Sequence, residues 1–145
     1  NESNKIVNSK IRSLISSSIT PIVCFGELSK ASLNDTLSTL IVEINSMLSE
    51  IPAEYVDKII FAYEPVWAIN NPDIYVDCNY VDKIASYIKN YFEITYGVRP
   101  SLLYGGSISL SNIDELNKID SLDGFLIGGA SAKVDVFNQI LDKIS

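Results

Sequence analysis

The chain contains no histidine and only two cysteines among its 145 residues. The lack of histidine removes the side chain that most often serves as a general acid or base and as a transition-metal ligand. Cys24 and Cys78 do not have the spacing of a metal site, so the sequence carries no signal for a bound metal. Because Cys24 lies inside an apolar run, we expect a buried structural thiol there and a reducing compartment.

Basic residues and long hydrophobic runs are also scarce. Eighteen acidic residues face eleven basic ones, which gives a net charge of −7 and a pI near 4.4. This charge, without a basic cluster, argues against nucleic acid and anionic membranes as partners. No apolar run approaches the ~20 residues that a membrane-spanning helix needs. An anionic ligand would therefore have to be held by local backbone dipoles.

The residues that are present alternate between two patterns. Apolar residues at helical spacing predict helices within residues 7–15, 33–51, 81–92, 111–117 and 137–144. Short apolar runs predict strands at residues 22–25, 59–63, 102–104 and 125–127. We expect Pro52 to end the second helix. A weak capping box from Ser111 to Asp114 is expected to begin the fourth.

One helix followed by four strand–helix units predicts an α/β fold with a parallel sheet and right-handed crossovers. With 47% hydrophobic and 20% charged residues, the composition is globular, and we interpret residues 1–145 as a single domain. Four parallel strands after a single helix look incomplete. The pattern leaves open a small open α/β domain or half of an eight-stranded barrel.

The most informative segment is residues 59–67, where an uninterrupted apolar run ends in Glu64 and Pro65. A run that does not alternate apolar with polar residues predicts a strand buried on both faces. Pro65 favours an extended backbone at Glu64, which aims the carboxylate from the strand end. Glu64 is therefore a candidate general base, and a merely solvated carboxylate fits this segment equally well.

Glycine pairs follow the last two predicted strands, as Gly105-Gly106-Ser107 and Gly128-Gly129. In parallel α/β proteins the carboxyl ends of the strands form the ligand-binding face. Bare backbone N–H groups at such ends suit a phosphate, and Ser107 adds a hydroxyl donor. Taken alone, each glycine pair also fits a tight turn.

Two more residues near strand ends have open roles. Glu27 follows the first predicted strand, where an ion-paired structural carboxylate is favoured over a catalytic one. Tyr104 directly precedes a glycine pair. It could donate a hydrogen bond near a ligand or simply pack at the strand end.

Four motifs span nearly the whole chain: PIVCFGE (residues 21–27), AYEPVWAI (62–69), LYGGS (103–107) and DGFLIGGAS (123–131). In this order and at about this spacing, they resemble the triosephosphate isomerase family. The resemblance implies the carboxyl-terminal half of a TIM (β/α)8 barrel, from the fourth helix through the eighth βα unit. Because a complete barrel typically has ~250 residues, it places the first four strands, with the family's catalytic lysine and histidine, before Asn1.

The resemblance also implies a reaction, the interconversion of dihydroxyacetone phosphate and glyceraldehyde 3-phosphate in glycolysis and gluconeogenesis. Glu64 matches the family's base, and Asn70, Ser107, Gly128 and Gly129 match the positions that bind the substrate phosphate. The substrate would be a small phosphorylated triose, without metal or organic cofactor. A cytoplasmic location and a homodimer of the full-length protein are further expectations, and the isolated chain is expected to be inactive.

The sequence departs from the family in the lid. After Trp67-Ala68-Ile69 the family usually reads Gly-Thr-Gly-Lys, whereas this chain reads Asn-Asn-Pro-Asp. Pro72 fixes its φ and lacks a donor, and Asp73 is negative where lysine is common. We expect altered lid closure. The alternative function is a non-catalytic phosphate-binding descendant or half-barrel fragment of the family, and a free-standing flavodoxin-like domain fits the motifs less well.

Overall fold

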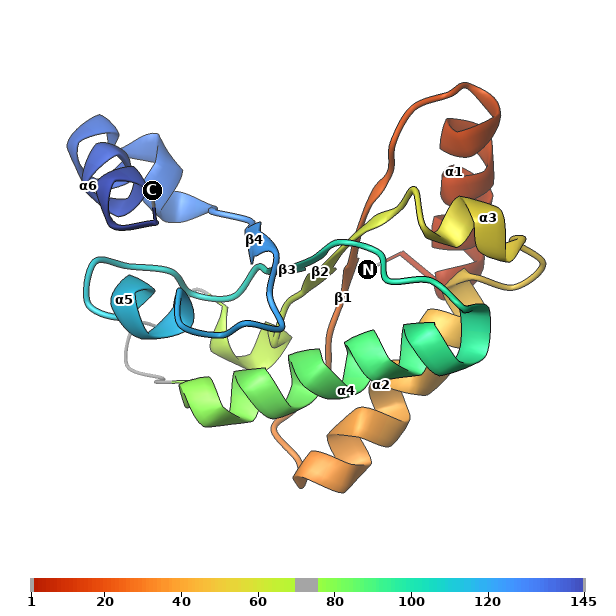
Figure 1. The fold of residues 1–145 in the computed structure, drawn as a ribbon, viewed down its shortest axis with the longest axis horizontal. Coiled ribbons are helices and arrows are strands. Elements are labelled where there is room, and N and C mark those ends of the chain that lie inside the picture. The colour runs from red at the N-terminus through yellow and green to blue at the C-terminus, as the bar shows by residue number, and fades with distance from the viewer. Residues whose placement is uncertain (1, 70–75, 145) are drawn as a thin grey trace.

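The four short apolar runs form one parallel sheet in the computed structural model, which describes residues 2–69 and 76–144 (Figure 1). The strands lie side by side in sequence order. Their bounds are β1 (Ile22–Phe25), β2 (Ile60–Tyr63), β3 (Leu102–Tyr104) and β4 (Gly124–Phe125). Every neighbouring pair is parallel. The predicted α/β fold is confirmed, although β4 has only two residues and is shorter than predicted.

The core lies between the sheet and two long helices, α2 (Leu33–Met47) and α4 (Cys78–Tyr96), which pack against each other (Figure 1). Phe61 on β2 packs against Phe92 on α4 with ring centroids 4.6 Å apart. Residues 61–63 each have 0% exposure. The prediction that this strand is buried on both faces is confirmed.

β1, at the edge of the described sheet, is buried on one face only. Val23 and Phe25 face the core, whereas Ile22 and Cys24 are exposed. The expected burial of Cys24 is therefore wrong. Side chains alternate between the two faces of a strand, and an apolar run alone does not show which face the helices leave uncovered.

The long helices begin at capping residues. In each case a side-chain oxygen one residue before the helix accepts a hydrogen bond from a backbone N–H of the first turn. The caps are Ser3 for α1 (Asn4–Ser16), Ser32 for α2 and Asp77 for α4. α4 ends as predicted at Gly97, whose φ of +70° suits a helix terminus.

The second predicted helix ends earlier than expected. α2 stops at Met47, and a separate short helix, α3 (Ala53–Val56), precedes β2. Glu50 has a φ of +60°, a conformation that a right-handed helix cannot continue. Leu48 and Ile51 in the intervening turn are nevertheless buried, so their spacing imitates a longer helix.

The carboxyl-terminal part carries two further helices. α5 (Ile113–Leu116) follows Asn112, whose side chain does not cap the helix, so the expected capping box from Ser111 is wrong. Asn112 Oδ1 instead accepts a hydrogen bond from the backbone N–H of Ser109 at 2.8 Å. α6 (Val134–Ile144) lies beyond β4, far from α1 and α3 (Figure 1).

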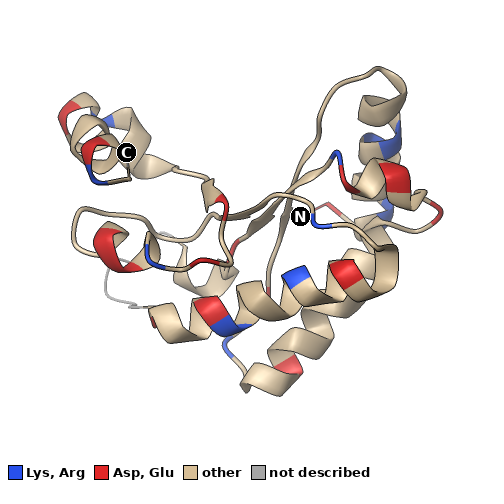
Figure 2. Ribbon diagram, viewed as in Figure 1, with Lys and Arg blue, Asp and Glu red and all other residues tan. Residues whose placement is uncertain are grey.

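Charged residues lie on the helices and loops, while the residues of the four strands are all uncharged (Figure 2). Acidic and basic side chains are interspersed along the outer helices. Within the described ranges, none of the helices is long and apolar enough to cross a membrane.

Candidate active site

Glu64 lies directly after β2, which is an interior strand of the described sheet. Its backbone N–H donates to the carbonyl oxygen of Phe25 at 2.8 Å. The N–H of Gly105 donates to the carbonyl oxygen of Tyr63, also at 2.8 Å. The chain at Glu64 is thus tied to both neighbouring strands. The glutamate follows a buried strand, as predicted, and its role as a base remains a prediction.

Two glycines leave room for Glu64. A Cβ atom at Gly26 would lie 1.7 Å from the Glu64 carbonyl oxygen. A Cβ atom at Gly105 would lie 2.8 Å from Glu64 Oε1. The sequence suggested that the glycine at 105 lets the backbone approach a ligand. In the structure, the space beside Gly105 is used by the Glu64 side chain.

Cys24 interacts with the same carboxylate. Although the residue as a whole is exposed, the pKa of its thiol is raised to about 11, mainly by partial burial. The negative charge of Glu64 and a hydrogen bond to it are the smaller causes of this shift. The thiol is therefore protonated at neutral pH, and it can donate to Glu64.

Glu27 is the most deeply buried acidic side chain in the described part of the chain, with 4% exposure. Its Oε1 accepts hydrogen bonds from Trp67 Nε1 at 2.7 Å, Tyr63 OH at 3.0 Å and Tyr80 OH at 3.4 Å. Its Oε2 is buried and has no hydrogen-bond partner among the described residues. These contacts agree with a structural carboxylate, but the expected ion pair is wrong, because the partners of Glu27 among the described residues are neutral donors.

This arrangement gives Glu27 a role that sequence reasoning missed. Tyr63 immediately precedes Glu64 and Trp67 follows three residues later, so one carboxylate holds both flanks of the candidate base. Burial, followed by the charge of Glu27, raises the pKa of Tyr63 well above its usual range. The available signal was the pair of aromatic residues with polar tips around Glu64, since buried tyrosine and tryptophan usually need a partner.

Ser107 and Tyr104 lie at the end of β3. Ser107 Oγ donates a hydrogen bond to the carbonyl oxygen of Ala68 at 2.9 Å. Ala68 ends the 3₁₀ helix η1 (Val66–Ala68), so the bond joins the loop after β3 to the segment after Glu64. The Tyr104 hydroxyl lies beside Gly106, where a Cβ atom would be 2.3 Å away from it. Tyr104 is buried, in agreement with a packing role.

The second glycine pair is much less confined. Gly128 and Gly129 are exposed, and a Cβ atom at either position would meet no atom within 4 Å. They stand at the start of the 3₁₀ helix η2 (Gly129–Ala132). Ser131 donates to the Gly128 carbonyl oxygen from its N–H at 2.9 Å and from its hydroxyl at 2.7 Å. Asn70 lies outside the described residues, as do the other lid positions singled out from the sequence.

The described side chains were also compared with the groupings that bind metal ions. Among the described residues, no three acidic, cysteine or histidine side chains form a group that could hold a metal ion.

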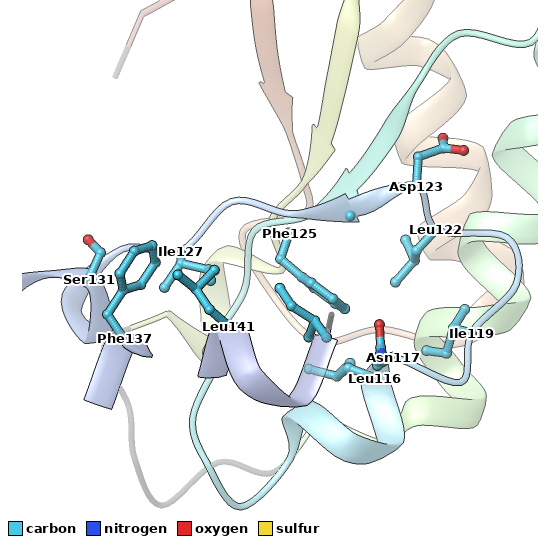
Figure 3. Close-up of a pocket in the computed structure, with 12 residues that line it drawn as sticks. Leu116, Asn117, Ile119, Leu122, Asp123, Phe125, Ile127, Ser131, Phe137 and Leu141 are labelled. Carbon is cyan, nitrogen blue, oxygen red and sulfur yellow. The ribbon is translucent and has the colours of Figure 1, made fainter. Parts of the chain in front are cut away.

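A cavity of about 470 Å³, lined by polar as well as apolar side chains, lies between β4, α5 and α6 (Figure 3). Phe125 from β4 points toward Leu116 from α5, while Phe137 and Leu141 extend from α6 (Figure 3). The predicted site residues that the structure describes do not line this cavity. It does not coincide with the described part of the candidate active site.

Comparisons with known proteins match this chain along almost its whole length. A family model described as triosephosphate isomerase matches residues 1–144. The triosephosphate isomerase of Alkaliphilus oremlandii is 34% identical, with 98% of this chain and 59% of the relative covered. That of Ureaplasma parvum is 37% identical, with 97% and 58% covered. The crystal structure of triosephosphate isomerase from Bartonella henselae has a TM-score of 0.80 and 32% identity, covering 98% of this chain and 58% of that one. The chain therefore spans somewhat more than half the length of these relatives.

Proposed function

The chain belongs to the triosephosphate isomerase family, and from this premise we propose that the whole protein interconverts dihydroxyacetone phosphate and glyceraldehyde 3-phosphate with Glu64 as the base. The observation that carries the proposal is how firmly Glu64 is held. Its backbone is bound to the neighbouring strands, and its flanking aromatic residues are bound to Glu27. A solvated glutamate at a strand end has no need of such an arrangement.

The proposed role of Glu64 is proton transfer. Its carboxylate removes a proton from the carbon next to the substrate carbonyl and returns it to the neighbouring carbon. Such a base is effective only when it is held in a near-attack position. Two features support this geometry: the hydrogen bonds fix the backbone of Glu64, and the absence of a side chain at Gly105 leaves room for its carboxylate.

The proposed phosphate site consists of Asn70, Ser107, Gly128 and Gly129. The exposed glycines after β4 offer backbone N–H groups that a side chain does not shield. Ser107 would release the Ala68 carbonyl oxygen to donate to the phosphate. A chain with a net charge of −7 repels an anion at long range, so these local donors would have to supply the attraction.

We propose further that residues 1–145 are one domain, corresponding to the carboxyl-terminal half of the barrel. With no histidine, this stretch cannot supply the family's electrophilic histidine, so the isolated chain should not turn over. For the whole protein, a homodimer in the cytoplasm is the proposal that follows from the family. No metal or organic cofactor is proposed.

A second candidate function is a phosphate-binding protein without turnover. The observation that favours it is the Asn-Asn-Pro-Asp sequence after Ile69, because a proline and an acidic residue replace common lid residues. Lid closure excludes water and completes a site of this kind. Such a protein would bind triose phosphate but would not isomerise it.

An isomerase assay of the whole protein tests both functions. We expect turnover in the wild type and a roughly 10³-fold lower kcat in Glu64→Gln, because the amide cannot accept the proton. Glu54→Gln, at an exposed glutamate on α3, is the matched control and should leave kcat unchanged. Equal activity of Glu64→Gln and wild type would remove Glu64 as the base. Triose phosphate binding without any turnover in the wild type would favour the second function.

A further inference from the structure

Glu43 on α2 is a half-buried carboxylate that contacts the candidate active site from the helix side. Its Oε2 accepts a hydrogen bond from the backbone N–H of Gly26 at 3.1 Å. Gly26 directly follows β1 and lies seventeen positions earlier in the sequence. This bond therefore connects α2 to the backbone on which Glu64 rests.

The backbone of residues 25–27 supports the Glu64 segment at three points, and we call it the Glu64 bed. The carbonyl oxygen of Phe25 accepts from the N–H of Glu64 at 2.8 Å, and that of Glu27 accepts from the N–H of Val66 at 3.1 Å. Between them, Gly26 lies so close that a Cβ atom would be 1.7 Å from the Glu64 carbonyl oxygen. A rotation of the Gly26 peptide would therefore displace Glu64.

We propose that Glu43 is a positioning residue for Glu64, acting through the peptide of Gly26. The inference rests on the proposed isomerase reaction, and it assigns a role in that reaction to a residue that does not lie at a strand end. In a continuous sheet, a strand would satisfy the N–H of residue 26. Here the acceptor is a helix side chain, so the orientation of this peptide depends on Glu43. A shift of about 1 Å at a catalytic group can lower a rate by about 10²-fold.

In this proposal, Glu43 positions Gly26 by accepting a hydrogen bond, and its negative charge is not required. Burial raises the pKa of its carboxyl group, the Gly26 hydrogen bond lowers it, and the negative charge of Glu27 raises it again. The negative charge of Glu27 therefore disfavours the ionised form of Glu43. Glutamine keeps an oxygen acceptor at the same distance along the side chain, whereas alanine has none. The two substitutions therefore separate the hydrogen bond from the charge.

The experiment compares Glu43→Ala and Glu43→Gln in the whole protein, with Glu54→Ala as the control for loss of an exposed carboxylate. We expect kcat to fall roughly 10-fold in Glu43→Ala with KM unchanged, because substrate binding is left intact while the base is misplaced. Glu43→Gln should stay within about twofold of the wild type. Hydrogen exchange at the Gly26 amide, followed by NMR, should be slow in the wild type and Glu43→Gln and faster in Glu43→Ala.

An unchanged kcat in Glu43→Ala, an equal loss in both variants, or a change in KM alone would overturn the proposal. If Glu43→Ala does not fold, the wild type and Glu43→Gln still decide it, because fast exchange of the Gly26 amide in the wild type contradicts the anchoring. The two proposals fail differently. If the wild type shows no turnover, both the isomerase function and the positioning role are wrong. If the wild type turns over and Glu43→Ala has the same kcat, only the positioning role is wrong.

Discussion

The Glu64 bed and the glycine pair after β4 are both parts of the candidate active site, but the protein holds them in opposite ways. Around Glu64, backbone hydrogen bonds tie the chain to both neighbouring strands, and Gly26 has no room for a methyl group. A Cβ atom at Gly128 or Gly129, by contrast, would meet no atom within 4 Å. The candidate base is fixed by the fold, whereas the candidate phosphate loop is left accessible.

The packing is also tighter around Glu64 than beneath the glycine pair after β4. β1 and β2 pair over four residues each, and β2 is flanked by a fully buried aromatic core. β4 has two residues, and the 470 Å³ cavity separates it from α5 and α6. The proposed base is thus positioned before substrate arrives, as proton transfer requires, whereas the proposed phosphate loop is less tightly packed.

The largest expected effect is a difference in stability between substitution of Gly26, which is closely surrounded, and substitution of Gly128 or Gly129, which are not. Gly26→Ala forces a Cβ atom into the Glu64 backbone, and we expect it to lower the free energy of unfolding by about 3 kcal/mol or more. Gly128→Ala and Gly129→Ala should each change it by less than about 0.5 kcal/mol. Urea denaturation of the whole protein measures both. Similar losses at all three positions would contradict the difference between the regions.

The next effect concerns the space beside the carboxylate. Gly105→Ala places a methyl group 2.8 Å from Glu64 Oε1, so the side chain must move while the backbone stays paired. We expect kcat to fall about 10²-fold with a smaller change in stability. Steady-state kinetics and thermal unfolding, run on the same samples, separate the two. Unchanged kcat in a folded Gly105→Ala protein would show that this glycine does not define the position of Glu64.

A moderate effect is expected from the donors around Glu27. Tyr63→Phe removes a hydroxyl that donates to the buried carboxylate, and the expected loss of stability is about 1–3 kcal/mol. Tyr87→Phe, at a tyrosine that is 45% exposed, is the control and should cost less than about 0.5 kcal/mol. Denaturant unfolding decides the comparison. Equal effects of the two substitutions would mean that Glu27 does not depend on Tyr63.

The smallest effect is a pH dependence at Glu43. Because the folded state raises the pKa of this carboxyl group, mainly through burial, its contribution to stability is present at low pH and is lost as pH rises through the folded-state pKa. Glu43→Gln, which stays neutral, should therefore raise Tm at pH 8 and leave it nearly unchanged at pH 4. Thermal scans at the two pH values measure the difference. A gain at pH 4 that disappears at pH 8 would reverse the assigned sign.

Periodicity alone was sufficient for much of the fold. The strand leading to Glu64 was identifiable because five apolar residues precede a glutamate and a proline, and α4 because its apolar stripe ends near Gly97. The same reasoning failed where the outcome depends on a distant neighbour. It placed Cys24 in the core, since the covered face of an edge strand is set by helices elsewhere in the chain. It also extended α2 to Pro52, since buried turn residues such as Leu48 share the helical spacing.

What the sequence determined by itself is the order of strands and helices, the position of Glu64 at the end of an apolar strand, and the family that the four motifs resemble. These follow from local patterns, which act over a few residues. Only the tertiary structure decided that Glu27 binds both flanks of Glu64, that Gly105 admits its carboxylate, and that Glu43 reaches Gly26. Each of these contacts joins residues seventeen or more positions apart. Such contacts exist only after parallel strands have been brought together by the helices that cross over between them.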